Sequence, residues 1–251
     1  MAKGLKLTTA EAKEFLKENP RWFASATFSR PIIITDYCDL SESDIECLSP
    51  YVIFRGRNAL GQCANFYNCQ KIDKLEGQYS GSVNASKASF KEIGVLKISR
   101  ADNQGYALRI RDCMDLKILT GKYPGTVYAA HCGIVATRNL EINADPNGMA
   151  ANYEGCQNYR IVTGEYIGSV SCYQSGIEGV SEKVSITTTK DTYKMDLRHC
   201  LNLTHCPDEI LNDSTTRIDV RTADQIGQQR ALDLVSREKL RGDPTKKSLE
   251  I

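Results

Sequence analysis

The chain has 251 residues, of which 41% are hydrophobic and 25% are charged, and its formal net charge is +1. This balance is typical of one elongated soluble domain and argues against nonspecific nucleic-acid binding, which needs a basic surface. No run approaches the roughly 18 apolar residues of a membrane span, and the first residues, MAKGLKLTTAEAKEF, lack the apolar stretch of a secretory signal peptide. We therefore expect no membrane span, no signal peptide and a location in the cytoplasm.

The first predicted element is a short helix over residues 8–19. Thr8 and Glu11 have the spacing of a capping box, Phe15 belongs to an apolar stripe, and Pro20 ends the helix. Three aromatic residues follow, and we expect them to help close the end of the fold: Trp22, Phe23 and Phe28. Because uncovered strand edges promote aggregation, residues 1–30 are predicted to be an N-terminal cap and lead-in.

Residues 31–222 contain a tandem repeat. Four cysteines recur at intervals of 44, 43 and 44 residues, together with their neighbours: Cys69, Cys113, Cys156 and Cys200. Inward and outward residues alternate before each cysteine, which is typical of a strand. A second strand in three of the units is marked by an isoleucine 29 or 30 residues after the cysteine: Ile98, Ile142 and Ile186. Such self-similarity predicts an array in which each unit stacks on its neighbours.

Each unit divides into two turns of a coil, of 19 to 20 and 24 to 25 residues. A turn of that length is one rung of a solenoid, in which parallel strands stack and alternate side chains enter a narrow core. The predicted core therefore consists of rows. One row holds the residue three before each cysteine, the second holds the isoleucines, and the third holds Val83, Val127 and Val170. A recurring G-x-Y-x-G stretch is placed at a corner, because glycine permits positive φ.

The array is predicted to end in shortened units, as solenoid caps do. Between Cys200 and Val220, the last predicted strand residue, the chain has no G-x-Y-x-G stretch. Beyond it, an apolar stripe that includes Ile226 predicts a second helix over residues 223–241. Residues 223–251 are therefore assigned to a C-terminal helix and tail.

The pattern resembles two known repeat families. The segments ALRIRDCMDL at 107–116 and KMDLRHCLNL at 194–203 look like the strand of cysteine-containing leucine-rich repeats, over about ten residues per rung. The second strand and the G-x-Y-x-G corner depart from that family, because they imply more than one parallel sheet. As a whole, residues 31–222 look more like a right-handed parallel β-helix, which polysaccharide lyases, glycosidases and phage tail or other virion proteins share. This resemblance implies an all-β solenoid of roughly eight rungs with short capping helices at both ends.

The ten cysteines are interpreted as a ladder of small buried side chains, because free cysteine is among the most buried residue types. Zinc needs clustered ligands, and the densest soft-ligand group is His199, Cys200, His205 and Cys206. A strand would point the adjacent His199 and Cys200 apart. We therefore expect no metal, no other cofactor and assembly in a reducing compartment.

Two polar stripes are predicted on the outer face of the strands. The positions two before the repeated cysteines are Tyr67, Arg111, Glu154 and Arg198. The positions four before are Asn65, Arg109, Asn152 and Asp196. A lyase would need carboxylates for calcium and a glycosidase would need carboxylates within about 5 to 10 Å, and Glu154 and Asp196 lie on adjacent units. The alternative interpretation is that these charges solvate an exposed sheet.

The tyrosines of the G-x-Y-x-G stretches recur at one corner, so we expect them to line one edge two rungs apart. Such an edge could bind sugar or protein, or it could simply rigidify the corner. The candidate binding residues are therefore Tyr79, Tyr123, Tyr166, Arg111, Glu154 and Arg198. We find no catalytic set.

These features favour a noncatalytic module for structure, assembly or adhesion, such as a tail, fibre or capsid-associated protein of a phage virion. We expect a protein partner or further copies of the chain, with carbohydrate as the alternative. Two other functions stay open. A carbohydrate-active β-helix enzyme would be favoured by carboxylates that converge in a groove, and a leucine-rich-repeat-like interaction module would be favoured by helical segments between the strands.

Overall fold

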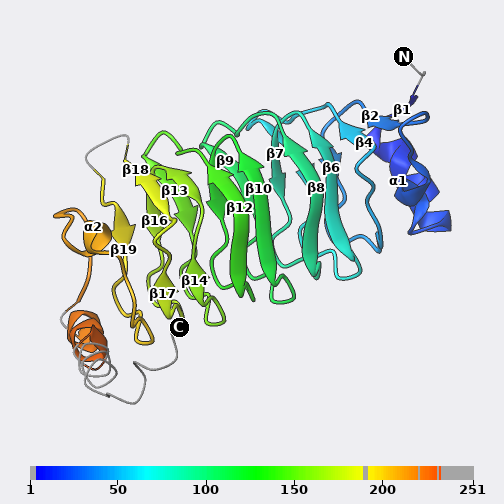
Figure 1. Ribbon diagram of the computed structural model, residues 1–251. Coiled ribbons are helices and arrows are strands. Elements are labelled where there is room, and N and C mark those ends of the chain that lie inside the picture. The colour runs from blue at the N-terminus through cyan, green and yellow to red at the C-terminus, as the bar shows by residue number, and fades with distance from the viewer. Residues whose placement is uncertain (1–3, 189–191, 220, 231, 233–251) are drawn as a thin grey trace, which may run out of the picture.

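The computed structural model describes residues 4–188, 192–219, 221–230 and 232. The chain winds about eight times around one axis, and each turn adds to two parallel sheets, here named sheet A and sheet B (Figure 1). The helix α1 (Thr9–Glu18) lies at one end of this coil, and α2 (Asp208–Leu211) lies at the other. The all-β solenoid predicted from the repeat is therefore confirmed.

Sheet A contains the longer strands. Its first half, in spatial order, is β1 (Leu5–Leu7), β2 (Ile32–Ile34), β4 (Val52–Phe54), β6 (Lys74–Tyr79) and β8 (Glu92–Ile98). It continues with β10 (Ile118–Tyr123), β12 (Ala136–Ile142), β14 (Ile161–Val162), β15 (Glu165–Ile167), β17 (Gly179–Val180) and β18 (Ser185–Thr187). Both β14 and β15 pair with β12, so the seventh turn contributes two short strands where each earlier turn contributes one strand.

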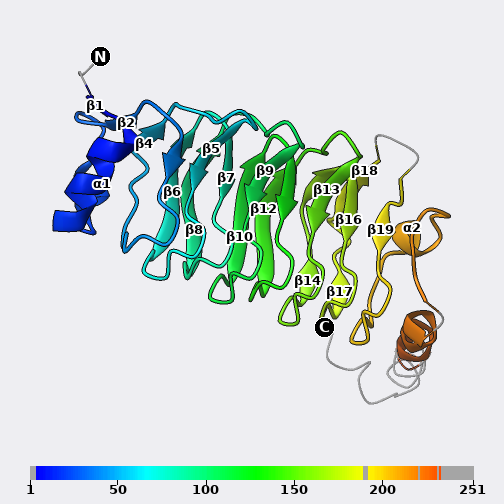
Figure 2. The same cartoon turned by 180° about the vertical axis from the view of Figure 1, so that it is seen from behind.

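Sheet B is built from shorter strands and stands behind sheet A, as the reversed view shows (Figure 2). Its strands follow the chain in order: β3 (Cys38–Asp39), β5 (Gln62–Asn65), β7 (Ser82–Asn84), β9 (Tyr106–Arg109), β11 (Thr126–Tyr128), β13 (Met149–Asn152), β16 (Ser169–Ser171) and β19 (Met195–Asp196). Every neighbouring pair is parallel. The residues between the two sheets form one continuous buried core.

The strand register confirms the predicted isoleucine and valine rows and joins them with residues that the prediction kept apart, and the residues of the remaining predicted row are fully buried. In sheet A, Tyr79 pairs with Ile98, and Ile142 pairs with both Tyr123 and Tyr166. The isoleucine row and the tyrosines are therefore one row. In sheet B, the valines alternate with the residues five before each cysteine, in the order Cys38, Ala64, Val83, Leu108, Val127, Ala151, Val170 and Met195.

The tyrosines lie inside the core and not along an exposed edge. Tyr79, Tyr123 and Tyr166 are 1%, 3% and 1% exposed, so the expectation that they line a binding edge is wrong. The glycine two residues earlier is not a corner residue. Gly121, for example, lies within β10 at φ +121°, where the pairing with β12 shifts register. The tyrosine side chain packs beneath this glycine. A Cβ added at Gly121 would lie only 3.1 Å from the hydroxyl of Tyr123.

The cysteines form the predicted buried ladder. All ten are free, and only Cys47 is not buried. At the corner that follows sheet B, five thiols donate hydrogen bonds of 2.6 to 3.0 Å to a backbone carbonyl of the preceding turn: Cys69, Cys113, Cys132, Cys156 and Cys200. Each of these cysteines therefore ties one turn to the next while it fills the core.

The N-terminal cap agrees with the sequence except at one residue. Thr8 and Glu11 form the capping box of α1, and Phe23 is fully buried with its ring 6.1 Å from that of Phe54. Trp22 is packed against the core. Phe28 does not close the end, because it is 84% exposed on a tight turn whose ends, at residues 27 and 30, bond to each other through the backbone.

The C-terminal end begins a further turn that stays incomplete. His205 bridges to Gly179 of sheet A, and Arg217 bridges to Asp196 of sheet B. Residues 221–230 are helical and bury Ile226. Of the rest of the helix predicted to residue 241, only residue 232 is among the described residues, and it is also helical. The short α2 was not predicted.

The described residues between β2 and β19 contain no helix, so the structure removes the feature that would have favoured the leucine-rich-repeat alternative. Within the described part of the chain, we also find no helix with the length and apolar character needed to cross a bilayer.

Candidate functional site

The outer face of sheet B carries two continuous rows of side chains. Residues in register share the first row: Asp39, Asn65, Asn84, Arg109, Tyr128, Asn152, Ser171, Asp196 and Arg217. The second row lies two residues further along, where successive turns are joined by backbone hydrogen bonds: Tyr67, Ser86, Arg111, Ala130, Glu154, Tyr173 and Arg198. The two polar stripes predicted from the sequence occupy every second position of these rows.

The intervening turns add aromatic residues that the sequence interpretation missed. Tyr128 follows Arg109, and Tyr173 follows Glu154, at an interval equal to the length of the shorter turn. The spacing that defined the turns would therefore have placed both tyrosines in the stripes. Both side chains are half-buried on the outer face.

At the C-terminal end, four of these row residues and Tyr193, which precedes β19, form a cluster, named here the Tyr-Arg cluster: Tyr173, Tyr193, Asp196, Arg198 and Arg217. Asp196 accepts two hydrogen bonds from the Arg198 guanidinium, at 3.0 and 2.7 Å, and lies 4.0 Å from the Arg217 guanidinium. The Arg198 guanidinium lies 5.4 Å from the ring centre of Tyr173, and that of Arg217 lies 4.3 Å from the ring centre of Tyr193. Cation–π contact and ion pairing thus hold both arginines in place.

The electrostatics of the Tyr-Arg cluster are set by Asp196, whose side chain is only 5% exposed, whereas that of Arg198 is 43% exposed. The carboxylate raises the pKa of the Arg198 guanidinium, through its hydrogen bond first and its charge second. Burial raises the pKa of Tyr193. The cluster therefore presents two oriented guanidinium groups beside two phenol rings.

A second cluster lies at the middle of the same face. The rings of Tyr106 and Tyr128 meet edge to face at 6.0 Å, and the Arg109 guanidinium lies 4.2 Å from the ring centre of Tyr106. Arg109 also forms a 2.8 Å ion pair with Asp102, which is buried at the corner that precedes β9. Nearer the N-terminal end, the Lys87 amine lies 5.6 Å from the ring of Tyr67.

The other predicted site residues are separate side chains on this face. Arg111 is exposed and lies 3.5 Å from Asp112. Glu154 is half-buried in the second row, two turns away from Arg198. Of the six predicted binding residues, the structure brings only Arg198 into a cluster with other functional side chains. The three tyrosines of the G-x-Y-x-G stretches are in the core.

Glu154 and Asp196, which lie on adjacent repeat units, are not on adjacent turns of the coil. The turn that carries Ser171 separates the turn of Glu154 from that of Asp196, and Asp196 is already engaged by two guanidinium groups. Among the described residues, no group of three or more histidine, cysteine, aspartate or glutamate side chains is arranged to hold a metal ion.

The four soft ligands near residue 200 make separate contacts. The Cys200 thiol donates to the Cys172 carbonyl at 2.9 Å, and His205 Nε2 lies 3.1 Å from a Glu182 carboxylate oxygen. The His199 ring lies 5.3 Å from that of Tyr173, at the edge of the Tyr-Arg cluster.

In comparisons with known proteins, no family model, no curated protein and no solved structure matches the chain.

Proposed function

We propose that this chain is a noncatalytic interaction module that binds a protein partner through the outer face of sheet B. The observation that carries the proposal is the Tyr-Arg cluster, in which Tyr173 and Asp196 orient Arg198 before any partner arrives. Tyrosine and arginine are enriched at protein interfaces and among their most energetic residues. Side chains that are already ordered lose little conformational freedom on binding.

The rest of the face supports a macromolecular partner over a small ligand. The two outer rows continue along the sheet from β5 to β19, and they place a second aromatic cluster around Tyr106 several turns away from the first. A protein can contact both clusters at once, whereas a small molecule fits a concave pocket. A carbohydrate-active enzyme is less well supported, because the Asp196 carboxylate is held by arginines.

The test compares two surface variants in a reconstituted complex. Proteins captured from the source cells by the wild-type chain are identified, purified and measured for direct binding. We expect Tyr173→Ala combined with Arg198→Ala to weaken binding of the true partner at least tenfold, and Lys122→Ala on sheet A to leave it unchanged. Circular dichroism and melting curves establish that both variants fold.

The proposal would be contradicted by a purified partner that binds the double variant and the wild-type chain equally well. Hydrolysis or lyase activity on polysaccharides that is lost in Asp196→Asn would instead favour the enzyme. A second copy of the chain counts as a partner, and light scattering across a concentration series detects it.

A narrower form of this proposal is that the chain assembles into a phage virion, as a tail, fibre or capsid-associated protein. It rests on the solenoid architecture and on the helices at both of its ends. Because one architecture serves many functions, this narrower form needs its own test. Mass spectrometry of purified particles tests it, since a stoichiometric component remains after salt washing and a contaminant does not.

A further inference from the structure

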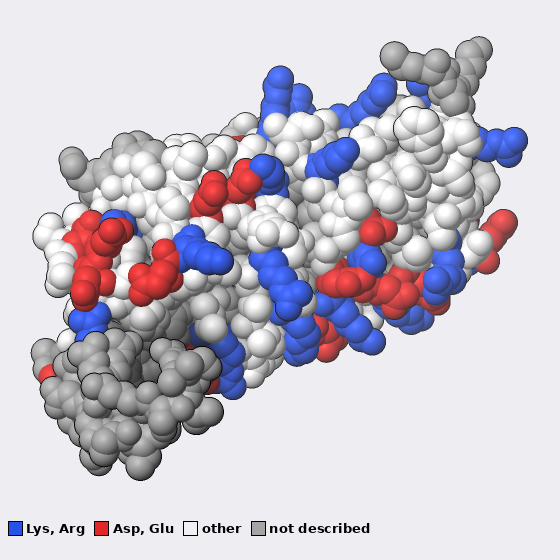
Figure 3. Space-filling model, in the orientation of Figure 1, with Lys and Arg blue, Asp and Glu red and all other residues white. Residues whose placement is uncertain are grey.

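The outer face of sheet A contains a hollow of about 650 Å³ that the proposed function does not use. It lies over the first part of β6, β8, β10 and β12, where lysine and arginine side chains gather along the lower edge of the molecule among acidic ones (Figure 3). Its volume is within the range of small-molecule sites, about 300 to 1,000 Å³. Ile93 and Ile118 give it an apolar part.

Four cations and two carboxylates line this hollow, and only one of the cations forms an ion pair with a carboxylate. Lys74 forms an ion pair with Glu92, and Asp73 lies 3.9 Å from the Arg21 guanidinium. Three cations remain, and in the described residues none of them has a carboxylate within 4.0 Å: Lys91, Lys117 and Arg138. The hollow therefore has an excess of positive charge although the whole chain is close to neutral.

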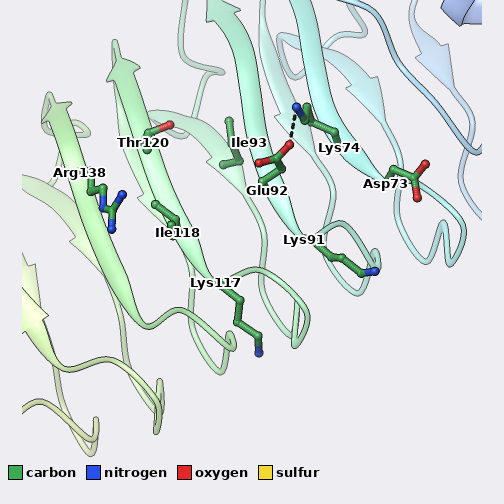
Figure 4. Close-up of a pocket in the computed structure, with 9 residues that line it drawn as sticks. All are labelled: Asp73, Lys74, Lys91, Glu92, Ile93, Lys117, Ile118, Thr120 and Arg138. Atoms are coloured by element: carbon green, nitrogen blue, oxygen red, sulfur yellow. Dashed lines mark ion pairs between the residues drawn. The ribbon is translucent and has the colours of Figure 1, made fainter.

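The three cations without a carboxylate partner come from three successive turns of the coil, and the Lys117 amine also donates to the Met114 carbonyl at 3.2 Å. Lys91 precedes β8 and Lys117 precedes β10, with a backbone hydrogen bond from Lys117 to Lys91, and Arg138 lies on β12 in register with Thr120 (Figure 4). Adjacent parallel strands lie about 4.8 Å apart, so the first and third cation are separated by about 10 Å along the coil axis. One phosphate group is too small to reach all three.

We infer that this hollow binds a ligand that carries two or more phosphate groups, laid across the turns of β8, β10 and β12. Lysine and arginine both bind phosphate oxygens through charge-assisted hydrogen bonds, and the Thr120 side chain lines the same hollow. The half-buried Ile118 leaves an apolar surface for an organic group beside the phosphates. The site is on the opposite sheet from the Tyr-Arg cluster, so it is independent of the proposed partner surface.

The test measures binding of inorganic tripolyphosphate to the full chain by calorimetry. We expect the combined variant Lys91→Gln, Lys117→Gln, Arg138→Gln to weaken binding at least tenfold. The control is Lys122→Gln, which removes a cation of the same sheet that lies outside the hollow and is paired with Glu141. It should stay within twofold of the wild-type chain. Because the cations are exposed, we also expect binding to weaken as salt is raised.

A second variant predicts a change in the opposite direction. Glu92→Gln removes the closer of the two carboxylates beside Lys74, the other being Glu76 at 4.0 Å, and takes one negative charge out of the hollow, so tripolyphosphate should bind several-fold more tightly. A gain of affinity cannot come from a folding defect. Vesicles that contain a phosphoinositide bisphosphate distinguish the source of the ligand: capture of the chain indicates a lipid headgroup, and binding of tripolyphosphate alone indicates a free phosphorylated ligand.

Three results would overturn the inference. The first is the absence of binding of both probes to the wild-type chain. The second is equal binding by the combined variant and the wild-type chain. The third is equal weakening by the combined variant and by Lys122→Gln, which would indicate diffuse attraction to the whole face.

Discussion

The hydroxyl of Tyr123 donates a hydrogen bond of 2.6 Å to the carbonyl of Thr120. The same bond joins Tyr79 to Glu76 at 2.6 Å and Tyr166 to Thr163 at 3.0 Å, so it recurs once in each full repeat. The glycine between the two residues has a positive φ, and this carbonyl faces the hydroxyl of the buried tyrosine. The buried tyrosine supplies the missing donor, and this need explains why glycine and tyrosine occur together in the repeat.

Tyr123→Phe removes only this hydroxyl and leaves a buried carbonyl without its side-chain donor. We expect the free energy of unfolding to fall by about 1 to 3 kcal/mol. Urea unfolding of the variant and the wild-type chain measures it. Tyr67→Phe on the outer face is the matched control and should change stability by less than about 0.5 kcal/mol. Equal stability of Tyr123→Phe and the wild-type chain would mean that the bond contributes nothing.

Gly121→Ala places a Cβ on a backbone at φ +121°, close to the Tyr123 hydroxyl. We expect a loss of about 1 to 3 kcal/mol, because residues with a side chain rarely adopt this conformation. Gly227→Ala is the control. Gly227 lies in the helical residues 221–230, and a Cβ there would meet nothing within 4 Å. That substitution should leave melting unchanged or raise it, and a similar loss in both variants would contradict the account.

Asp102 and Asp145 occupy equivalent corners, and each accepts two backbone N–H groups through its carboxylate. Only Asp102 also holds an arginine, Arg109. We expect Asp102→Asn to lower the free energy of unfolding by about 2 kcal/mol, because a largely buried guanidinium loses its charged acceptor. Asp145→Asn should leave the free energy of unfolding nearly unchanged. At the equivalent corner of the first repeat, the side-chain oxygen of Asn58 already accepts two backbone N–H groups. Equal losses in thermal melts of the two variants would contradict this difference.

Alkaline pH should destabilise the fold through its buried thiols. Burial raises the pKa of Cys38 from 9.0 to about 12, so between these values the unfolded chain loses a proton that the folded chain retains. The stability that this thiol contributes is therefore constant well below pH 9 and is lost as pH rises toward 12. From pH 8 to pH 10 this one thiol accounts for about 1.4 kcal/mol.

Urea unfolding at pH 8 and pH 10 measures this loss, and Cys38→Ala should reduce the difference between the two values by the same amount. A wild-type chain with equal stability at both pH values would show that the thiols are not protected by burial.

Most of the fold follows from one spacing. The repeat of the cysteines gives the unit, and the alternation of shorter and longer turns gives the rows. The tyrosines were misplaced because the G-x-Y-x-G stretch was interpreted as a corner. The interval from Tyr79 to Ile98 equals the shorter turn, so the two residues had to share a row. Phe28 was misplaced because hydrophobicity alone does not show that a turn directs a side chain to solvent.

The sites were less predictable than the fold. Arg198 could be placed on the outer face by alternation, but its contact with Tyr173 joins two different turns and depends on the register between them. The hollow of sheet A depends on which cations lack a carboxylate partner. That pairing arises between side chains of adjacent turns, such as Lys74 and Glu92, and no motif in the chain records it.

The measurement that tests the proposed function most directly is a side-chain footprint of the chain with and without its purified partner, by hydroxyl-radical labelling and mass spectrometry. Protection of Tyr173 and Tyr128 on sheet B, with unchanged labelling of Ile118 and Ile161 on sheet A, is the predicted result. Protection confined to the sheet A residues, with both tyrosines labelled as in the free chain, would contradict the assignment of sheet B as the binding face.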